Sequence, residues 1–169
     1  PLGVCFRPDS HRKDPPVEGY DVLLFLHVYS VVAWVGGGAL LNILGARLSR
    51  AGTPQQLADF GAQVEWVGLR VFTPLSVIAL VFGILMAIDD RWEFGQMWIQ
   101  LGLGGWFLSF LLGAGFLGPQ SGKLGRLIRE HGAEHPEVRP RLQRLLLVAR
   151  LDMLLLLLVI ADMTIKPGA

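Results

Sequence analysis

The feature that most constrains this chain is a run of apolar residues too long for the core of a small soluble protein. Residues 22–46 contain no Asp, Glu, Lys or Arg. A helix over this stretch, at about 1.5 Å of rise per residue, exceeds the roughly 30 Å hydrocarbon core of a bilayer. Hydrophobic residues make up 52% of the 169-residue chain, more than a domain of this size can hide from water. The run is therefore predicted to cross a membrane.

Three more apolar segments follow the first. The spans are predicted at about residues 22–46, 66–88, 97–119 and 142–165. Thr53 and Pro54 mark the start of the second helix as N-cap and first helical residue, and the mixed stretch after them is expected at the membrane interface. Polar segments separate the spans. The sequence thus predicts an all-α, polytopic membrane protein in which residues 21–169 form an antiparallel bundle of four transmembrane helices.

The first 20 residues differ in character from the rest. They carry Pro8, Pro15 and Pro16 among alternating basic and acidic side chains. They lack the apolar core of a cleavable signal and are expected to form a polar, flexible extension. The single cysteine, Cys5, lies in this extension, which excludes an internal disulfide and a thiolate metal cluster.

Basic side chains predict the orientation in the membrane. Eight of them follow the first and third spans, against five on the opposite side. The eight are Arg47, Arg50, Lys123, Arg126, Arg129, Arg139, Arg141 and Arg144, and the five are Arg7, Arg12, Lys13, Arg91 and Lys166. Segments rich in Lys and Arg stay in the cytoplasm. The chain is therefore expected in the bacterial cytoplasmic (inner) membrane with both termini outside.

The basic segment from Lys123 to Arg144 has a predicted partner of its own. It borders the bilayer and has no aromatic residues interleaved with its charges. This composition favours anionic lipid headgroups over nucleic acid.

Small residues on two spans predict close helix packing. Gly105, Ser109 and Gly113 recur every four residues on the third span, and Gly37 and Gly38 lie on the first. Small side chains let membrane helices approach closely, either within one chain or between two copies. Pro74, within the second span, is expected to bend its helix.

Ionisable residues at membrane depth are costly and are therefore candidate functional residues. Arg70 and Asp152 are expected at one depth, where they can pair beside Asn42. Asp162 lies near the outer side, four residues before Lys166, so a surface ion pair is available to it. Pairs of this kind can be purely structural, or they can belong to a proton pathway.

His27 is the only histidine in any predicted span. At about 100° per residue, His27 shares one face of the helix with Ser30, Trp34, Gly38, Asn42 and Gly45. This face, which is mostly polar or small, is expected to point into the bundle. A neutral imidazole there can ligate a haem iron (haem b) or a metal ion, relay a proton, or hydrogen-bond a neighbouring helix. A haem held by two histidines of this chain is excluded.

The sequence resembles a family of uncharacterised bacterial predicted integral membrane proteins, related to the copper-resistance protein CopD and more distantly to HemJ. The resemblance covers about residues 21–168. It rests on Leu26-His27-Val28, Trp34-Val35-Gly36-Gly37, Phe72-Thr73-Pro74 with Gly83, Gly118-Pro119, Asp152 and the final Met163-Thr164-Ile165-Lys166-Pro167-Gly168.

This resemblance implies two kinds of chemistry. HemJ-like proteins use a first-span histidine around haem, and His27 is similar in position; their third-span lysine has no counterpart between Arg91 and Lys123. CopD-like proteins are associated with copper transport across the inner membrane. The methionines here, Met86, Met97, Met153 and Met163, are scattered along the chain.

The motifs of common enzymes do not occur in the sequence. There is no phosphate-binding loop, nucleophile elbow or zinc-binding helix motif. The leading hypothesis is a non-catalytic integral inner-membrane protein, acting alone or as an accessory subunit of a larger membrane complex. The alternatives are a haem- or metal-binding redox protein that uses His27, and a proton-coupled carrier.

Overall fold

The structure is a computed structural model that describes residues 19–167. Within these residues it is entirely helical, which confirms the predicted all-α class. The six α-helices are α1 (Gly19–Ala51), α2 (Pro54–Val67), α3 (Thr73–Asp89), α4 (Met97–Phe110), α5 (Gly118–His131) and α6 (Val138–Ile165). Two π-helical segments are η1 (Gly68–Phe72) and η2 (Leu111–Leu117). Most of the predicted N-terminal extension lies outside the described residues.

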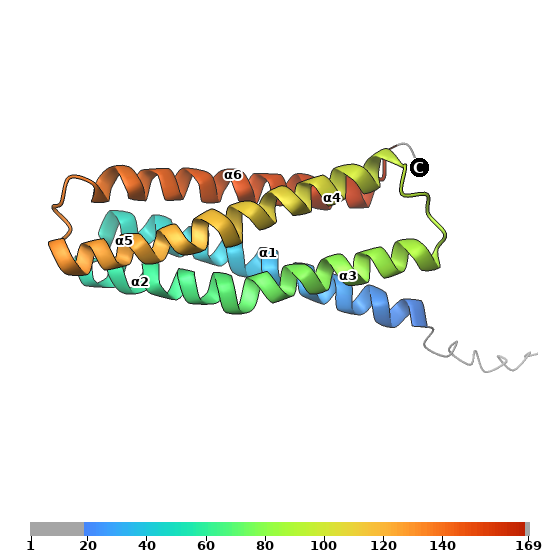
Figure 1. Cartoon of the computed structure of the whole chain (residues 1–169), viewed down its shortest axis with the longest axis horizontal. Helices are drawn as coiled ribbons and strands as arrows, with labels where there is room; N and C mark the ends of the chain where they lie inside the picture. The colour runs from blue at the N-terminus through green and yellow to red at the C-terminus, as the bar shows by residue number, and fades with distance from the viewer. Residues whose placement is uncertain (1–18, 168–169) are drawn as a thin grey trace, which may run out of the picture.

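The π-helical segments join shorter helices into long rods. One rod runs without a break over Pro54–Asp89 and another over Met97–His131. In Figure 1 these rods lie alongside α1 and α6, with α2 and α5 at one end of the molecule and α3 and α4 at the other. The beginning of α1 and the end of α6 lie at the same end as α3 and α4.

Three helices are long and apolar enough to cross a membrane by length and composition: Gly19–Ala51, Pro54–Asp89 and Met97–His131. The fourth rod, α6, has 28 residues but carries Arg150, Asp152 and Asp162 within its apolar stretch. Helix α6 is therefore not one of the three candidate membrane-spanning helices. Three helices therefore fit the expectation of several membrane spans. The fourth span, predicted along α6, stays a prediction.

The rod over Met97–His131 is longer than the predicted span 97–119. Its helix continues through Gly118 and Pro119 and ends at His131. Lys123, Arg126 and Arg129, expected in a connecting loop, therefore lie on α5. The sequence predicts that the helix ends near Pro119. Membrane helices tolerate proline within them, which explains why the helix continues.

The start of α2 follows the predicted capping. The hydroxyl of Thr53 accepts a hydrogen bond from the backbone N–H of Gln56 at 3.2 Å, and the Gln56 side chain accepts one from the Thr53 N–H at 2.9 Å. Pro54 occupies the first turn, where its missing N–H leaves no donor unpaired. This reciprocal pair fixes the boundary between α1 and α2.

Each π-helical segment lies just before a proline. The N–H of Thr73 bonds to the carbonyl of Gly68, and the Thr73 hydroxyl donates to the same carbonyl at 2.9 Å. The N–H of Gly118 bonds to the carbonyl of Gly113. Proline removes a donor and crowds the preceding turn, and a wider π turn accommodates both effects. The bend expected at Pro74 therefore takes the form of a π turn.

The closest helix contact is between α2 and α5. A Cβ atom on Gly61 would lie 2.6 Å from the carbonyl oxygen of Ser121, and one on Gly125 would lie 2.6 Å from that of Ala58. Backbone therefore packs on backbone, as small residues allow. The buried side chains beside this contact form a core cluster of Ala58, Leu124, Ile128, Val138 and Leu145.

The glycines predicted to mediate packing have different neighbours. Gly37 lies against the ring of Phe72, Gly38 against Met153, and Gly105 against Val159 on α6. Ser109 is buried, whereas a Cβ on Gly113 would meet nothing within 4 Å. The expected ladder thus stops at Ser109, because Gly113 lies in the π turn that follows it. The contacts at Gly37, Gly38 and Gly105 are within one chain.

The outer surface of the helices is rich in large apolar side chains. Phe25, Val32 and Ile43 of α1 are each at least 60% exposed. A soluble protein rarely exposes such residues in continuous patches. Lipid is the solvent that suits this surface.

Candidate intramembrane site

Two partly open cavities lie between the described helices, and Trp34 and Leu156 line both of them. The first, of about 150 Å³, is bounded by both π-helical segments and by Asn42, Ser109 and Asp152. We call it the Asp152 cavity. The second, of about 470 Å³, is lined by α1, α3, α4 and α6 and includes His27. We call it the His27 cavity.

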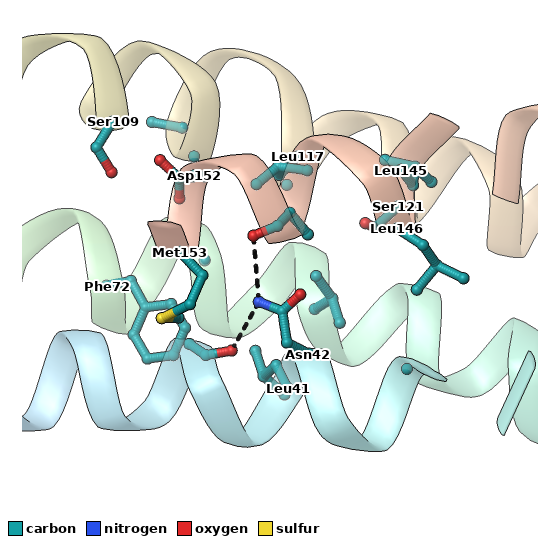
Figure 2. Close-up of a pocket in the computed structure, with 18 of the residues that line it drawn as sticks. Leu41, Asn42, Phe72, Ser109, Leu117, Ser121, Leu145, Leu146, Asp152 and Met153 are labelled. Atoms are coloured by element: carbon teal, nitrogen blue, oxygen red, sulfur yellow. Dashed lines mark hydrogen bonds between the residues drawn. The ribbon is translucent and has the colours of Figure 1, made fainter. Parts of the chain in front are cut away.

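The Asp152 cavity contains polar atoms that have no hydrogen-bond partner. Figure 2 shows Ser109 of α4 and Asp152 of α6 pointing toward one another. The Ser109 hydroxyl and the Asp152 Oδ1 atom are both buried, and neither has a hydrogen-bond partner of ordinary geometry, although the hydroxyl is close enough to the carboxylate to interact with it. The amide nitrogen of Asn42 donates to the carbonyls of Gly38 at 3.1 Å and Ala149 at 3.4 Å, as Figure 2 shows.

The other buried serines behave differently. The Ser30 hydroxyl donates to the Leu26 carbonyl at 2.8 Å, and the Ser76 hydroxyl donates to the Thr73 carbonyl at 2.8 Å. Serines in helices commonly satisfy their hydroxyl in this way on the preceding turn. The Ser109 hydroxyl does not, and Ser109 is only 1% exposed. This contrast singles out Ser109.

The expected ion pair between Arg70 and Asp152 does not form. Arg70 is exposed, and no ion pair of the described residues involves it. It lies in η1, where the wider π turn changes the direction that regular helical spacing predicts. The ion pairs that do form are Arg126–Glu65, Arg129–Asp59 and Arg141–Glu137, all outside the Asp152 cavity.

The expected pair between Asp162 and Lys166 is also absent. Both carboxylate oxygens of Asp162 are buried without a hydrogen-bond partner, and one of them faces Gly102 of α4. The Lys166 ammonium instead lies 4.8 Å and 5.1 Å from the ring centres of Trp92 and Trp98, a favourable cation–π arrangement. Helix α6 ends at Ile165 and Lys166 takes a left-handed conformation, φ 49°. The Lys166 N–H still bonds to the Asp162 carbonyl at 2.8 Å, but the left-handed conformation departs from the helical geometry that a side-chain pair at this spacing requires.

His27 is held by the neighbouring helix α3. Its Nδ1 atom lies 2.8 Å from the carbonyl oxygen of Ala79, so Nδ1 carries the proton and donates. The ring lies against Gly83, where a Cβ atom would come within 3.0 Å of the imidazole Cε1. An imidazole bonded through Nδ1 has its Nε2 lone pair left for a ligand.

The His27 cavity also brings together residues that are far apart in the sequence. Met86 of α3 and Met163 of α6 line it, together with the aromatic side chains of Trp98 and Trp106. The sequence shows these methionines only as scattered residues, because their common place in the cavity lining depends on how whole helices are arranged. Among residues 19–167, no group of three or more His, Cys, Asp or Glu side chains is placed to hold a metal ion.

Long apolar helices, an apolar exterior and polar groups confined to the interior define the class of this chain as an integral membrane protein. The family model described as "Predicted integral membrane protein (DUF2269)" matches residues 21–167, and the chain belongs to that family. No curated protein and no solved structure matches the chain.

Proposed function

We propose that the chain is a four-span, antiparallel protein of the bacterial inner membrane with both termini outside. Helix α6 packs along α4, and the atoms of Asp152 and Asp162 that are buried point into the bundle. Two of the charges that interrupt its apolar stretch are therefore shielded from lipid, which supports a fourth span. At about 1.5 Å per residue, its 28 residues are long enough to cross the bilayer.

The distribution of charge supports the proposed orientation. The end formed by α2 and α5 carries the basic residues of α5 and the start of α6, whereas the opposite end carries Asp89, Asp90 and Glu93. Basic segments stay cytoplasmic. The Lys123 to Arg144 segment then lies at the inner leaflet, where we propose that it binds anionic lipid headgroups.

For function, we propose a non-catalytic protein that holds a haem or a soft metal ion at His27. The observation that carries this proposal is the 2.8 Å contact from His27 Nδ1 to the Ala79 carbonyl, in a residue that lines a cavity of about 470 Å³. A backbone carbonyl on Nδ1 commonly orients a histidine that ligates through Nε2. The proposal agrees with the resemblance to CopD and HemJ.

The residues of the cavity fit such a group. His27 supplies an imidazole nitrogen, and Met86 and Met163 supply thioether sulfurs to the lining of the same cavity. Histidine with methionine is a ligand pair found for haem iron, and thioethers also favour Cu(I). The bound group would supply electron transfer, while this chain orients the imidazole and surrounds the group with apolar and aromatic side chains.

The exposed face of α6 supports a role as a subunit of a larger membrane complex. Leu147, Leu151, Leu154 and Leu158 follow one another at spacings of four, three and four residues, and each is more than 50% exposed. This is the spacing by which one helix packs against another. We propose that a helix of a partner subunit occupies this face.

The proposal is tested on protein purified in mild detergent from its native membrane. We expect a Soret band or a stoichiometric metal, lost in His27→Ala and kept in His131→Ala, whose histidine is exposed at the end of α5. A colourless, metal-free preparation would contradict ligand binding. The same preparation on a native gel tests the subunit role, and a single species with the mass of this chain alone would contradict it.

A further inference from the structure

The Asp152 cavity has an uncompensated negative group at membrane depth. Asp152 Oδ1 is buried and has no hydrogen-bond partner, and no Lys or Arg lines the cavity. The arginine expected to neutralise it, Arg70, is exposed. A carboxylate in hydrocarbon surroundings is stabilised either by a cation or by taking up a proton, because its desolvation costs several kcal/mol in general.

Two neighbouring residues of the cavity lining also carry side-chain oxygen atoms. The Ser109 hydroxyl faces Asp152 across the cavity (Figure 2) and is not used by its own helix. The Asn42 amide donates through its nitrogen to two backbone carbonyls, which leaves its side-chain oxygen as an acceptor. A carboxylate, a hydroxyl and an amide oxygen are the donor set that hard cations prefer.

The size and charge of the cavity define which cation fits. One carboxylate compensates one positive charge, so a divalent ion would leave an excess charge at membrane depth. A cavity of about 150 Å³ has room for several water molecules. A small ion can therefore keep part of its water shell there.

The backbone around the cavity is irregular in a way that suits an ion. Both π-helical segments contribute to its wall, through Gly68, Phe72, Gly113 and Leu117. Irregular backbone at membrane depth is tolerated where it lines a polar cavity, and π turns are frequent at functional sites.

We propose that the Asp152 cavity is a binding site for one partly hydrated alkali-metal cation, Na⁺ in the first place, held by Asp152, Ser109 and Asn42. This site is separate from His27 and does not depend on the ligand proposed there. Trp34 and Leu156, which line both cavities, lie where the two sites adjoin.

Binding is measured directly with radioactive ²²Na⁺ on the purified full-length protein at pH 7.5, with N-methylglucamine chloride keeping the ionic strength constant. We expect saturable binding of one Na⁺ per chain. Asp152→Asn keeps the shape of the side chain and removes its charge, and we expect it to abolish binding. Asp162→Asn, a buried carboxylate on the same helix outside the cavity lining, should bind as the unmodified protein does.

The serine positions provide a second matched pair. Ser109→Ala removes an unpartnered oxygen from the cavity and is expected to weaken Na⁺ binding about tenfold, the usual effect of one hydrogen bond or ligand contact to a charge. Ser30→Ala removes a hydroxyl equally buried but bonded to Leu26, and should leave the affinity unchanged. Circular dichroism of each variant identifies one that fails to fold, and Ser109→Ala then replaces Asp152→Asn as the decisive variant.

Two results would overturn the proposal. One is the absence of saturable Na⁺ binding in a folded protein. The other is a thermal stability that depends on pH in N-methylglucamine buffer and does not change when Na⁺ is added. That result would show that a proton, and not Na⁺, compensates Asp152.

Discussion

Individual residues of the interior differ in how far the sequence reveals their role. His27 and Asp152 stand out in the sequence because a titratable group in an apolar run is expensive, and both line interior cavities. Their partners could not be predicted in the same way. The Ala79 carbonyl that holds His27 has no sequence signature, and nothing in the sequence shows that Arg70, which lies in a π turn, is exposed.

Gly83 offers a residue-scale test of how His27 is held. In Gly83→Ala the new Cβ would lie 3.0 Å from Cε1 and 3.2 Å from Nδ1 of His27, so the imidazole must move away from Ala79. We expect a loss of about 1–3 kcal/mol in the free energy of unfolding, typical of overpacking, together with loss of any group bound at His27. The measurement is thermal unfolding in detergent beside the absorption spectrum.

Gly36→Ala is the matched control for this substitution. A Cβ atom on Gly36 meets nothing within 4 Å, so its unfolding temperature should match or slightly exceed that of the unmodified protein. Equal behaviour of the two variants would show that Gly83 does not position His27.

At the scale of elements, regular periodicity predicts where the helices lie better than which way their residues point. The start of α2 at Pro54 follows from Thr53 and its capping partner. The π turns before Pro74 and Pro119 rotate the residues near them relative to regular spacing. The contact of Gly61 with α5 was missed for another reason: small residues of α5 are interleaved with Lys123, Arg126 and Arg129, and the charges suggested a loop.

The contact between α2 and α5 predicts a strong effect of small substitutions. In Gly61→Ala the Cβ would lie 2.6 Å from the Ser121 carbonyl oxygen, and backbone cannot rotate away as a side chain can. The helices must separate, at an expected cost of about 1–3 kcal/mol. Gly113→Ala, where a Cβ meets nothing within 4 Å, should be neutral. Denaturant titrations of both variants in mixed micelles measure the difference, and equal midpoints would mean that α2 and α5 are not in backbone contact.

At the scale of the whole molecule, the apolar runs are enough to predict a helical membrane protein. Its interior cavities depend on how the helices are arranged. The cavities form between residues from distant parts of the chain, such as Asn42 and Asp152. A single sequence carries no information on such pairs, because each depends on the packing of whole helices. The apolar segments, in contrast, follow from the local cost of exposing backbone to lipid.

The proposed orientation is tested with single cysteines in a Cys5→Ser background. Gly95 lies between α3 and α4, and Glu134 lies between α5 and α6, both exposed. In intact spheroplasts, a membrane-impermeant maleimide should label Gly95→Cys and spare Glu134→Cys. Both should react after permeabilisation. The reverse pattern would place the termini in the cytoplasm, and labelling of both in intact spheroplasts would contradict the four-span topology.

The backbone contact between α2 and α5 gives the two ends of the protein different mechanical properties. Near Gly61 and Gly125 no rotatable side chain separates the two helices, so this end is stiff. At the opposite end, side chains such as Trp98 and Met163 form the cavity wall and can change rotamer. Thermal fluctuations will therefore concentrate in the half formed by α3 and α4, which faces the periplasm in the orientation that we propose.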